Sequence, residues 1–300
     1  MAILIDRRTR ILVQGLTGRE ASFFAAESLA YGAQIVAGVT PGKGGSQVHG
    51  IPVYDCVAAA RCDHPAEATL ISVPAWAAQD AAQEAFAHGL KLAVIATERI
   101  PRRDVVTIVE SAAAHGGRVI GPNSLGLIAP GLSRIGAAGG TVDSVRRAYV
   151  PGPIGIMSRS GGMMTEIADL LTRHHLGQST CISIGGDPIV GSTFVDLLPL
   201  YEADPQTRAL VLFCEPGGSM EEQLAEHVGA HGSRLPIVAF VAGRFADRMQ
   251  GVRFGHAGAL VEDRRGSPAG KVDALRDAGI VIAEKLSQLP RLVREAMGTT

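Results

Sequence analysis

The chain has 300 residues and a mass of 31.2 kDa, enough for one large α/β unit or two domains of ordinary size. Hydrophobic residues make up 46% of the chain and charged residues 19%, a balance that excludes intrinsic disorder. The formal net charge of −1 argues against a nucleic-acid or membrane-surface partner.

The four cysteines lie apart, without the CxxC spacing of a metal or redox site, so we expect reduced thiols and no metal site in this chain. The opening MAILID is shorter than the apolar core of a signal peptide, and no apolar run has the length of a membrane span. These features predict a cytoplasmic protein that contacts neither a membrane nor nucleic acid.

The first half of the chain alternates between short apolar segments and segments of helical composition. The apolar segments are typical of buried strands, at residues 11–14, 35–40, 70–73, 92–96 and 119–120. Helices are expected between them, at residues 19–31, 75–88 and 104–115. This alternation predicts βαβ units and a parallel sheet that is buried on both faces.

Residues 129–153 break the alternation because they are rich in Gly, Ala, Ser and Pro, and we expect a linker there. The pattern then resumes, with strands expected at residues 154–157, 181–184, 209–214, 237–241 and 280–283. The predicted fold is therefore α/β, with two tandem doubly wound domains over residues 1–128 and 154–300. In such folds, ligands bind beyond the carboxyl ends of the strands.

Two glycine-rich loops of the first domain are candidate anion sites. Residues 15–18 (GLTG) connect a strand to a helix, where free backbone N–H groups attract anions. They lack the GxGxxG spacing of a dinucleotide site and also fit an ordinary tight turn. Lys43 stands between glycines that allow close backbone approach, although a solvated surface lysine is the alternative. Together, the loops predict a phosphate-bearing ligand.

The second domain has its own candidate phosphate site. Residues 158–162 (SRSGG) follow a strand and precede a helix, so N–H groups and hydroxyls suit a phosphate, with simple helix capping as the alternative. His256 stands among small residues that leave its ring approachable. A neutral imidazole can attack phosphorus while its other nitrogen donates to a carboxylate, for which Glu215 is the candidate. A structural or merely exposed histidine is the alternative.

Eight segments, taken in chain order, carry a resemblance to a known family: ILID, QGLTGRE, YGAQIVAGVTPGKGG, GPNSLGLIAPG, SRSGGM, SIGGDPIVGSTFVD, YEADPQTRALVLFCEPGG and FGHAGAL. Through them, residues 1–290 resemble the α subunits of succinyl-CoA synthetase, within the nucleoside-diphosphate-forming acyl-CoA ligases. The resemblance implies a CoA-binding Rossmann-like domain followed by a flavodoxin-like ligase domain.

The resemblance also implies which residues bind CoA. These lie in the first-domain loops and are Thr17, Gly18, Arg19, Glu20, Lys43, Ala96, Thr97 and Glu98. The CoA thiol is expected near Pro122, Asn123 and Ser124.

The phosphorylated residue of the family corresponds to His256, and the glutamate that orients it corresponds to Glu215. The phosphate and substrate loop corresponds to Ser158, Ser160, Gly161, Gly162 and Thr165. In the family, a nucleoside triphosphate and a carboxylate give an acyl phosphate, and CoA displaces phosphate to form a thioester. ATP or GTP, with Mg²⁺, belongs to a separate ATP-grasp β subunit, so an αβ or α₂β₂ complex is implied.

The substrate loop departs from the pattern of the succinate enzymes, which usually read SRSGTLTYE. Gly162 stands at the position of a threonine and Thr165 at that of the tyrosine, so two hydroxyl groups are lost beside the carboxylate. The form SRSGGM is more similar to ATP-citrate lyase and citryl-CoA synthetase. Succinate, a substrate of the tricarboxylic acid cycle, leads among short-chain carboxylic acids, with malate and citrate as alternatives. The segment at residues 243–248 also departs from the family's TAPKGK.

Two other classes of function fit parts of the sequence less well. A nicotinamide-dependent dehydrogenase would suit the first half, but the GxGxxG fingerprint is missing and Thr40-Pro41 stands where an acidic ribose ligand is expected. A non-catalytic CoA-binding regulatory protein would not need both His256 and Glu215. The sequence therefore favours a catalytic subunit.

Overall fold

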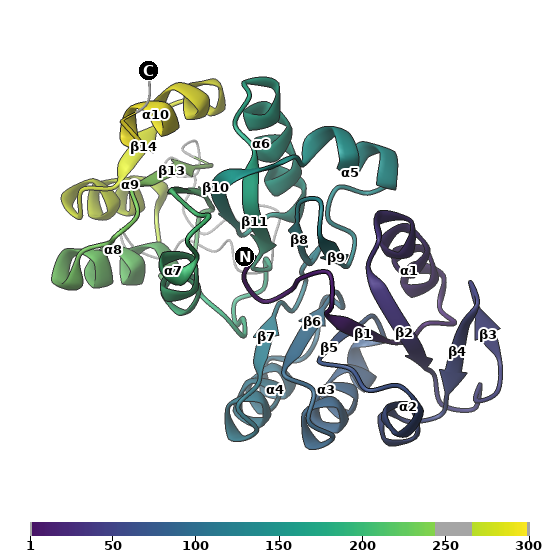
Figure 1. The fold of residues 1–300 in the computed structure, drawn as a ribbon. Helices are drawn as coiled ribbons and strands as arrows, with labels where there is room; N and C mark the ends of the chain where they lie inside the picture. Colours follow the sequence, from purple (N-terminus) through teal and green to yellow (C-terminus); the bar gives the residue numbers. More distant parts are fainter. Residues whose placement is uncertain (1, 244–265, 299–300) are drawn as a thin grey trace.

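The computed structural model describes residues 2–243 and 266–298. Two seven-stranded sheets organise the molecule, one in each half of the chain (Figure 1). The strands of the first half are β1 Arg10–Gln14, β2 Gln34–Val39, β3 Gln47–Val48, β4 Ile51–Tyr54, β5 Ala68–Ile71, β6 Leu92–Ile95 and β7 Arg118–Ile120. Its helices are α1 Arg19–Tyr31, α2 Val57–Asp63, α3 Ala78–Ala87 and α4 Arg102–Ala114.

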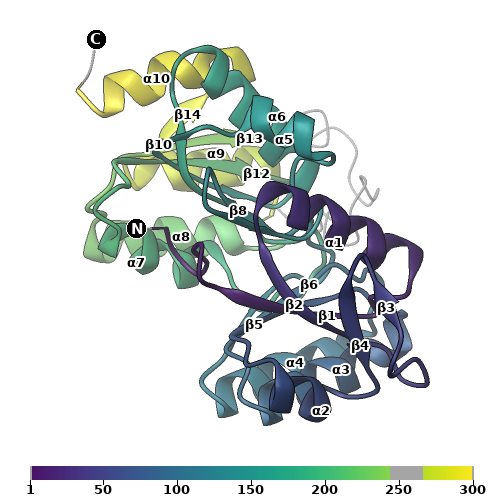
Figure 2. The same cartoon turned by 45° about the vertical axis from the view of Figure 1, so that its right-hand side comes forward.

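The first sheet has the strand order β3-β4-β2-β1-β5-β6-β7. Apart from the short β3, all its pairs are parallel, and the order is that of a doubly wound dinucleotide-type fold. The direction of winding reverses between β1 and β5, which places a ligand crevice beyond the carboxyl ends of these two strands. Figure 2 shows α1 on one face of this sheet and α2, α3 and α4 on the other.

The second half follows the same plan with a different winding. Its strands are β8 Leu127–Ala129, β9 Ser133–Ile135, β10 Pro151–Ser158, β11 Gln178–Ser183, β12 Ala209–Cys214, β13 Ile237–Val241 and β14 Val281–Ala283. Its helices are α5 Val142–Ala148, α6 Gly161–Arg173, α7 Phe194–Ala203, α8 Met220–His231, α9 Pro268–Asp277 and α10 Leu289–Ala296. The sheet order is β14-β13-β12-β10-β11-β8-β9, a flavodoxin-like order whose winding reverses between β10 and β12.

The predicted α/β class and doubly wound topology are confirmed, but two details differ from the sequence prediction. The segment at residues 129–153, expected to be a linker, contains β9, α5 and the start of β10. In addition, β8 pairs antiparallel with both β11 and β9, so the second sheet is mixed rather than fully parallel. These strands have only three residues each and are flanked by glycines, and Arg134 is completely buried in β9. Such a segment has the composition of a loop.

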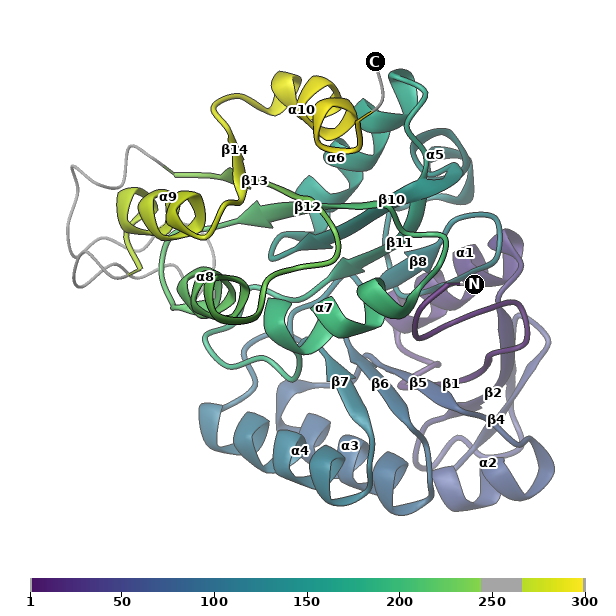
Figure 3. The ribbon, with the colours of Figure 1, turned by 60° about the vertical axis from the view of Figure 1, so that its left-hand side comes forward.

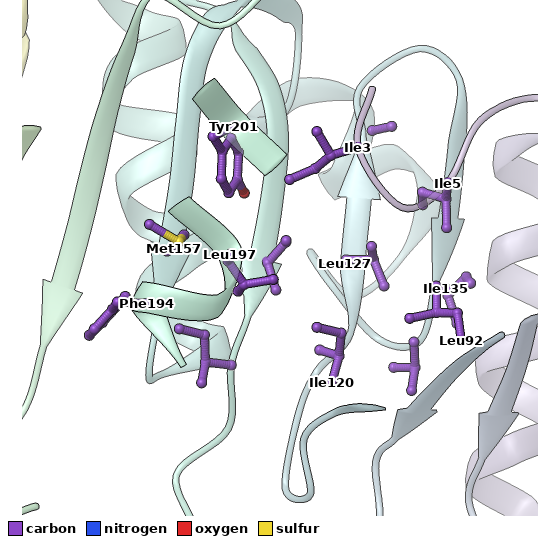
Figure 4. Packing of buried hydrophobic residues seen from close by; sticks show 14 of the residues in the cluster. Ile3, Ile5, Leu92, Ile120, Leu127, Ile135, Met157, Phe194, Leu197 and Tyr201 are labelled. Carbon is purple, nitrogen blue, oxygen red and sulfur yellow. The ribbon is translucent and has the colours of Figure 1, made fainter. Parts of the chain in front are cut away.

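Four hydrophobic clusters form the core of the described residues. One packs α2 on the first sheet, one packs α3 and α4 on the same sheet, and one packs α5, α6 and α10 on the second. The largest cluster lies between the sheets and includes α7, which Figure 3 shows between them. Figure 4 shows this shared cluster at close range, with side chains from both halves: Ile3, Ile5, Leu92, Ile120, Leu127, Ile135, Met157, Phe194, Leu197 and Tyr201. Burying one such side chain contributes about 1.5–3 kcal/mol, so this layer ties the halves together.

Within the described residues, the helices are too short or too polar to cross a bilayer.

Candidate functional site

A cavity of about 520 Å³ opens at the carboxyl edge of the first sheet, at the point where the winding reverses. Three strand ends and a loop surround it, so residues far apart in sequence share one wall. The lining consists of Gly18, Arg19, Glu20, Ala21, Phe24, Ser72, Val73, Pro74, Ala96, Thr97, Glu98, Asn123, Ser124 and Leu125. Most residues that the resemblance assigned to CoA are therefore brought together in one cavity.

The amino end of α1 forms one wall of this cavity. Gly18 caps the helix without a side-chain hydrogen bond, so the N–H groups of the first turn have no side-chain acceptor at the cap. Backbone N–H groups and the helix dipole favour phosphate at such a position, and the Arg19 side chain adds a positive charge beside it. These residues fit the diphosphate of a nucleotide-type ligand.

Three residues of the predicted CoA set lie outside the cavity lining, namely Thr17, Lys43 and Pro122. The Thr17 N–H donates to Thr40 Oγ1 at 3.5 Å in the turn that leads into α1. Lys43 is exposed in the loop that follows β2, where Ser46 Oγ donates to its carbonyl at 2.6 Å. Gly44 is held against Asp55, whose carboxylate accepts the Gly44 N–H at 2.9 Å. This loop is thus ordered by its own contacts.

The ends of β5 and β6 are joined by the Thr97 hydroxyl, which donates to Val73 O at 2.7 Å and accepts from Val73 N at 3.2 Å. The hydroxyl of Thr97 therefore shapes the cavity wall. Glu98 is exposed and lies 3.4 Å from the guanidinium of Arg99.

The loop at residues 121–126 leads from the first sheet to the second. Ser124 Oγ donates to Ser183 O at 2.6 Å, and Asn123 Nδ2 donates to Asp187 Oδ1 at 3.1 Å. A Cβ on Gly185 would lie 2.1 Å from Pro122 O, so only glycine allows this approach. The loop with the three residues predicted near the CoA thiol, Pro122, Asn123 and Ser124, therefore packs against residues at and just after the carboxyl end of β11.

Leu125 connects the cavity to the start of α6. It lines the cavity, and a Cβ on Gly161 would lie 2.4 Å from Leu125 Cγ. The cavity wall and the first residue of α6 are therefore in close contact. A ligand that extends along this wall reaches the amino end of α6 in the second half.

Hydroxyl groups organise the turn before α6. Ser160 caps the helix by accepting from Met163 N, and the buried Ser158 Oγ donates to Ser160 O at 2.5 Å. Thr165 Oγ1 lies 2.9 Å from the hydroxyl of Tyr149, whose pKa is raised by burial. These three hydroxyls have internal partners, whereas Gly162 is exposed and a Cβ there would meet no atom of residues 2–243 and 266–298 within 4 Å.

Glu215 lies at the carboxyl end of β12, across the winding reversal from the α6 turn. Its side chain is half-buried, and its backbone N–H donates to Glu221 Oε1 at 3.4 Å. His256, the predicted phosphorylated residue, lies outside the described residues. The described chain ends on either side of it at Gly243, where a Cβ would lie 2.4 Å from Pro216 Cγ, and at Gly266, whose carbonyl accepts the Gly217 N–H at 2.8 Å.

The sequence prediction missed a set of charged residues beneath the Glu215 loop: Arg159, Glu221, Glu222 and Lys271. All four are buried. Arg159 carried a weak signal, because it lies inside the predicted phosphate loop. The other three occupy polar positions of helices, where sequence alone predicts solvent exposure.

Comparisons with known proteins agree with this geometry. Residues 6–99 match the CoA binding domain family, and residues 157–281 match the CoA-ligase family. The chain is 44% identical to the succinate–CoA ligase [ADP-forming] subunit alpha 1 of Archaeoglobus fulgidus, over 99% of both chains. This chain belongs to the succinyl-CoA synthetase α-subunit family. It is an acid–thiol ligase of the NDP-forming type, as the sequence predicted.

The family includes enzymes for more than one acid. The chain is 40% identical to an ADP-forming sulfoacetate–CoA ligase subunit of Bilophila wadsworthia, over 99% of this chain and 100% of that one. The structure of ATP citrate lyase from Methanothrix soehngenii, in complex with citrate and coenzyme A, superposes with a TM-score of 0.90 at 25% identity. The match covers 99% of this chain but only 50% of that lyase chain.

Proposed function

We propose that this chain is the catalytic α subunit of a carboxylate–CoA ligase that works through a phosphohistidine. The γ-phosphoryl group of a nucleoside triphosphate passes to His256, releasing the nucleoside diphosphate. The carboxylate substrate then attacks that phosphorus, which frees the imidazole and forms an acyl phosphate. Finally, the CoA thiol attacks the acyl carbon and displaces inorganic phosphate, leaving the thioester.

One observation carries this proposal: the close contact of Leu125 with Gly161. It connects the cavity of the first sheet, which fits CoA, to the α6 turn of the second sheet, which fits a phosphate. The CoA thiol would extend along the loop at residues 121–126. It would then meet an acyl phosphate that is bound at the amino end of α6. Such alignment of two reactants is the main source of rate in transfer reactions of this kind.

The chain's own residues have distinct roles in these steps. The first turn of α1 and Arg19 bind phosphate groups of CoA, and Thr97 shapes the wall behind them. The first N–H groups of α6 stabilise the negative charge on the transferred phosphoryl group. Glu215 holds the imidazole of His256 in the tautomer that exposes its reactive nitrogen, an assignment that rests on the sequence resemblance.

We infer a short-chain acid as the substrate, with succinate first and citrate, malate and sulfoacetate as the alternatives. Gly162 leaves open space at the start of α6 where the succinate enzymes usually have a threonine, and this space suits a bulkier or differently charged acid. Thr165 does not replace the lost tyrosine hydroxyl, because its own hydroxyl is bonded to Tyr149.

The nucleotide and Mg²⁺ are assigned to a separate ATP-grasp β subunit in an αβ or α₂β₂ complex. The relatives that match over their full length are named as subunits, which supports a partner of this kind. We place the complex in the cytoplasm.

The test is to co-express the chain with its β subunit and to incubate the complex with γ-labelled ATP or GTP. We expect an acid-labile, alkali-stable phosphoprotein, and thioester formation from one acid in a panel of succinate, citrate, malate and sulfoacetate. His256→Asn should abolish both. Label that persists in this variant would remove His256 from its role.

A thermal-shift measurement separates the ligase from a dehydrogenase. CoA at about a hundredfold over its Kd should stabilise the protein by about 2.7 kcal/mol, whereas NAD should have no effect. Stabilisation by NAD alone would overturn the proposed function.

A further inference from the structure

Four charged side chains are buried together beneath the loop at residues 215–218. Arg159 lies at the carboxyl end of β10, Glu221 and Glu222 lie in the first turn of α8, and Lys271 lies in α9. Arg159, Glu221 and Lys271 are between 0% and 1% exposed. The two positive and two negative charges of this set balance. Charged side chains are rarely buried unless they are paired in this way.

The ion pairs link three elements of the second half. Glu221 accepts from Lys271 Nζ at 2.5 Å through Oε2, and its Oε1 lies 3.4 Å from Arg159 Nη1. Glu222 Oε2 accepts from the same lysine at 2.9 Å. Burial acts to raise the pKa of the Glu221 carboxyl, but the positive charges of Arg159 and Lys271 outweigh it and hold the pKa below its ordinary value.

The same side chains hold the backbone of the Glu215 loop. Arg159 Nη1 donates to Glu215 O at 3.0 Å and to Gly217 O at 2.8 Å. Lys271 Nζ donates to Gly218 O at 2.9 Å, and Glu221 Oε1 accepts the Glu215 N–H. Three of the loop's carbonyls and the N–H of Glu215 are thus fixed by buried charges.

The set also holds Gly266, where the described chain resumes after the segment that carries His256. Glu222 Oε1 accepts the Gly266 N–H at 2.6 Å. Gly266 O accepts the Gly217 N–H at 2.8 Å, so the two backbone segments lie side by side. Arg159 immediately precedes Ser160, the cap of α6. One set of charges therefore contacts the Glu215 loop, the α6 turn and the flank of the His256 segment.

Stability alone is a weak reason for this arrangement. Removing charges from water is costly, and well-packed apolar side chains of similar volume are often as stabilising as a buried ion pair. What apolar side chains cannot do is direct several hydrogen bonds at the carbonyls of an irregular loop.

We propose that Arg159, Glu221 and Lys271, together with Glu222, form a clamp of positioning residues that sets the Glu215 loop for phosphoryl transfer. This role rests on the proposed function, in which Glu215 orients the phosphorylated imidazole. The clamp acts through the backbone and touches no substrate. A small displacement of a positioned group can lower a rate by about a hundredfold, so a loosened loop impairs catalysis even in a folded protein.

The first test is Arg159→Lys in the complete complex, because lysine keeps the charge but lacks the planar guanidinium that places Nη1 against two carbonyls and a carboxylate. We expect faster hydrogen exchange at the amides of residues 215, 217 and 266, and a kcat lower by about tenfold to a hundredfold. The KM for CoA should not change, because the CoA cavity lies on the first sheet. Wild-type exchange and kcat in this variant would overturn the proposal.

Arg134→Lys is the matched control. Arg134 is also completely buried, and its Nη1 donates to Ala138 O at 3.0 Å and to Gly140 O at 2.9 Å, but it lies on β9 at the far edge of the sheet. We expect a lower Tm from this variant, with an unchanged kcat of the folded protein. An equal loss of kcat in both variants would assign Arg159 a structural role only.

A second comparison separates positioning from charge balance. Glu221→Gln leaves an unbalanced buried charge, whereas Glu221→Gln combined with Lys271→Met restores neutrality. The double variant should recover Tm relative to the single one but keep a low kcat, because Gly218 O and the Glu215 N–H have lost their charged partners. If the double variant recovers kcat as well as Tm, the proposal that these residues position the Glu215 loop is wrong.

Hydrogen exchange requires no activity, so it also separates this proposal from the function on which it rests. A wild-type complex that forms neither phosphoprotein nor thioester would overturn the proposed function, while the exchange rates would still decide whether the clamp holds the loop.

Discussion

At the scale of single residues, two adjacent glycines at the start of α6 differ in what surrounds them. A Cβ on Gly161 would lie 2.4 Å from Leu125 Cγ, whereas a Cβ on Gly162 would meet no atom of the described residues within 4 Å. Gly161 is thus required by the contact between the two halves. Among the described residues, no such packing contact requires a glycine at position 162.

This difference predicts opposite effects of the same substitution. Gly161→Ala should lower the free energy of unfolding by about 1–3 kcal/mol, because Leu125 must shift. Gly162→Ala should raise it by up to about 1 kcal/mol, because alanine restricts the unfolded chain and favours the helix. Urea unfolding of the two variants measures both values. Equal effects at the two positions would contradict the contact with Leu125.

At the scale of elements, the loops that follow β10 and β12 flank the winding reversal of the second sheet. The buried charges of Arg159, Glu221 and Lys271 connect these loops to α8 and α9. Gly217 and Gly218 both have positive φ angles and no side chains to hold the Glu215 loop. Its carbonyls are held instead by Arg159 and by Lys271 of α9, which both lie more than 50 residues away in the sequence.

The lowered pKa of Glu221 predicts a dependence of stability on pH. A carboxyl whose pKa is depressed by folding stabilises the protein above its unfolded pKa, near 4.5, and this contribution is lost as the pH falls through the lower folded value. Glu221→Gln should therefore cost about 3–5 kcal/mol at neutral pH, and the difference from wild type should narrow under acid conditions. Denaturant unfolding at about pH 7 and about pH 3.5 measures this difference.

Glu295→Gln is the control for this prediction. Glu295 pairs with Arg291 on α10, and both side chains are more than half exposed, at 56% and 60%. We expect a change below about 0.5 kcal/mol at either pH. A difference for Glu221→Gln that stays constant from neutral to acid pH would show that the charge of Glu221 is not the cause.

At the scale of the whole molecule, the shared cluster between the sheets makes the two halves interdependent. Leu127 belongs to the second sheet and packs in the same cluster as Leu92 of the first. The loop at residues 121–126 adds hydrogen bonds to the end of β11. Packing in this shared core therefore fixes the position of the first-sheet cavity relative to the α6 turn.

We expect the two halves to unfold together. Leu127→Ala should lower the free energy of unfolding by about 2–5 kcal/mol, and it should shift the transitions of both halves by the same amount. Hydrogen exchange at increasing urea, followed in peptides from β6 and β12, tests this. Separate midpoints for the two peptides would show that the halves unfold independently.

Much of the fold was predictable because the signals are local. The apolar runs that form β1 and β12 are buried along nearly their whole length, β10 is buried from Ile154 onward, and glycine turns mark their ends. The short strands β8 and β9 were missed because β8 pairs with β11, about 50 residues away, while β9 pairs with β8, and no periodic pattern develops over three residues.

The candidate site was predictable in part. Residues at the ends of β5 and β6 and at the start of α1 meet in one cavity, as the general rule for doubly wound sheets predicts. The sequence did not predict which partners the hydroxyls of Ser158, Ser160 and Thr165 have, because a hydroxyl at a helix start can face a ligand or an internal acceptor. Only the tertiary structure shows that the Thr165 hydroxyl has an internal partner, the hydroxyl of Tyr149.

The sequence by itself determined the class of fold and the family, because apolar strand runs, glycine turns and family motifs are each contained in short stretches of chain. The tertiary structure alone decided that Glu221 and Lys271 are buried charges rather than solvated helix positions, and that Leu125 lies between the first-sheet cavity and the amino end of α6. The physical reason is that burial and electrostatic pairing depend on the neighbours of a side chain in space. Many of those neighbours come from segments that are distant in the sequence.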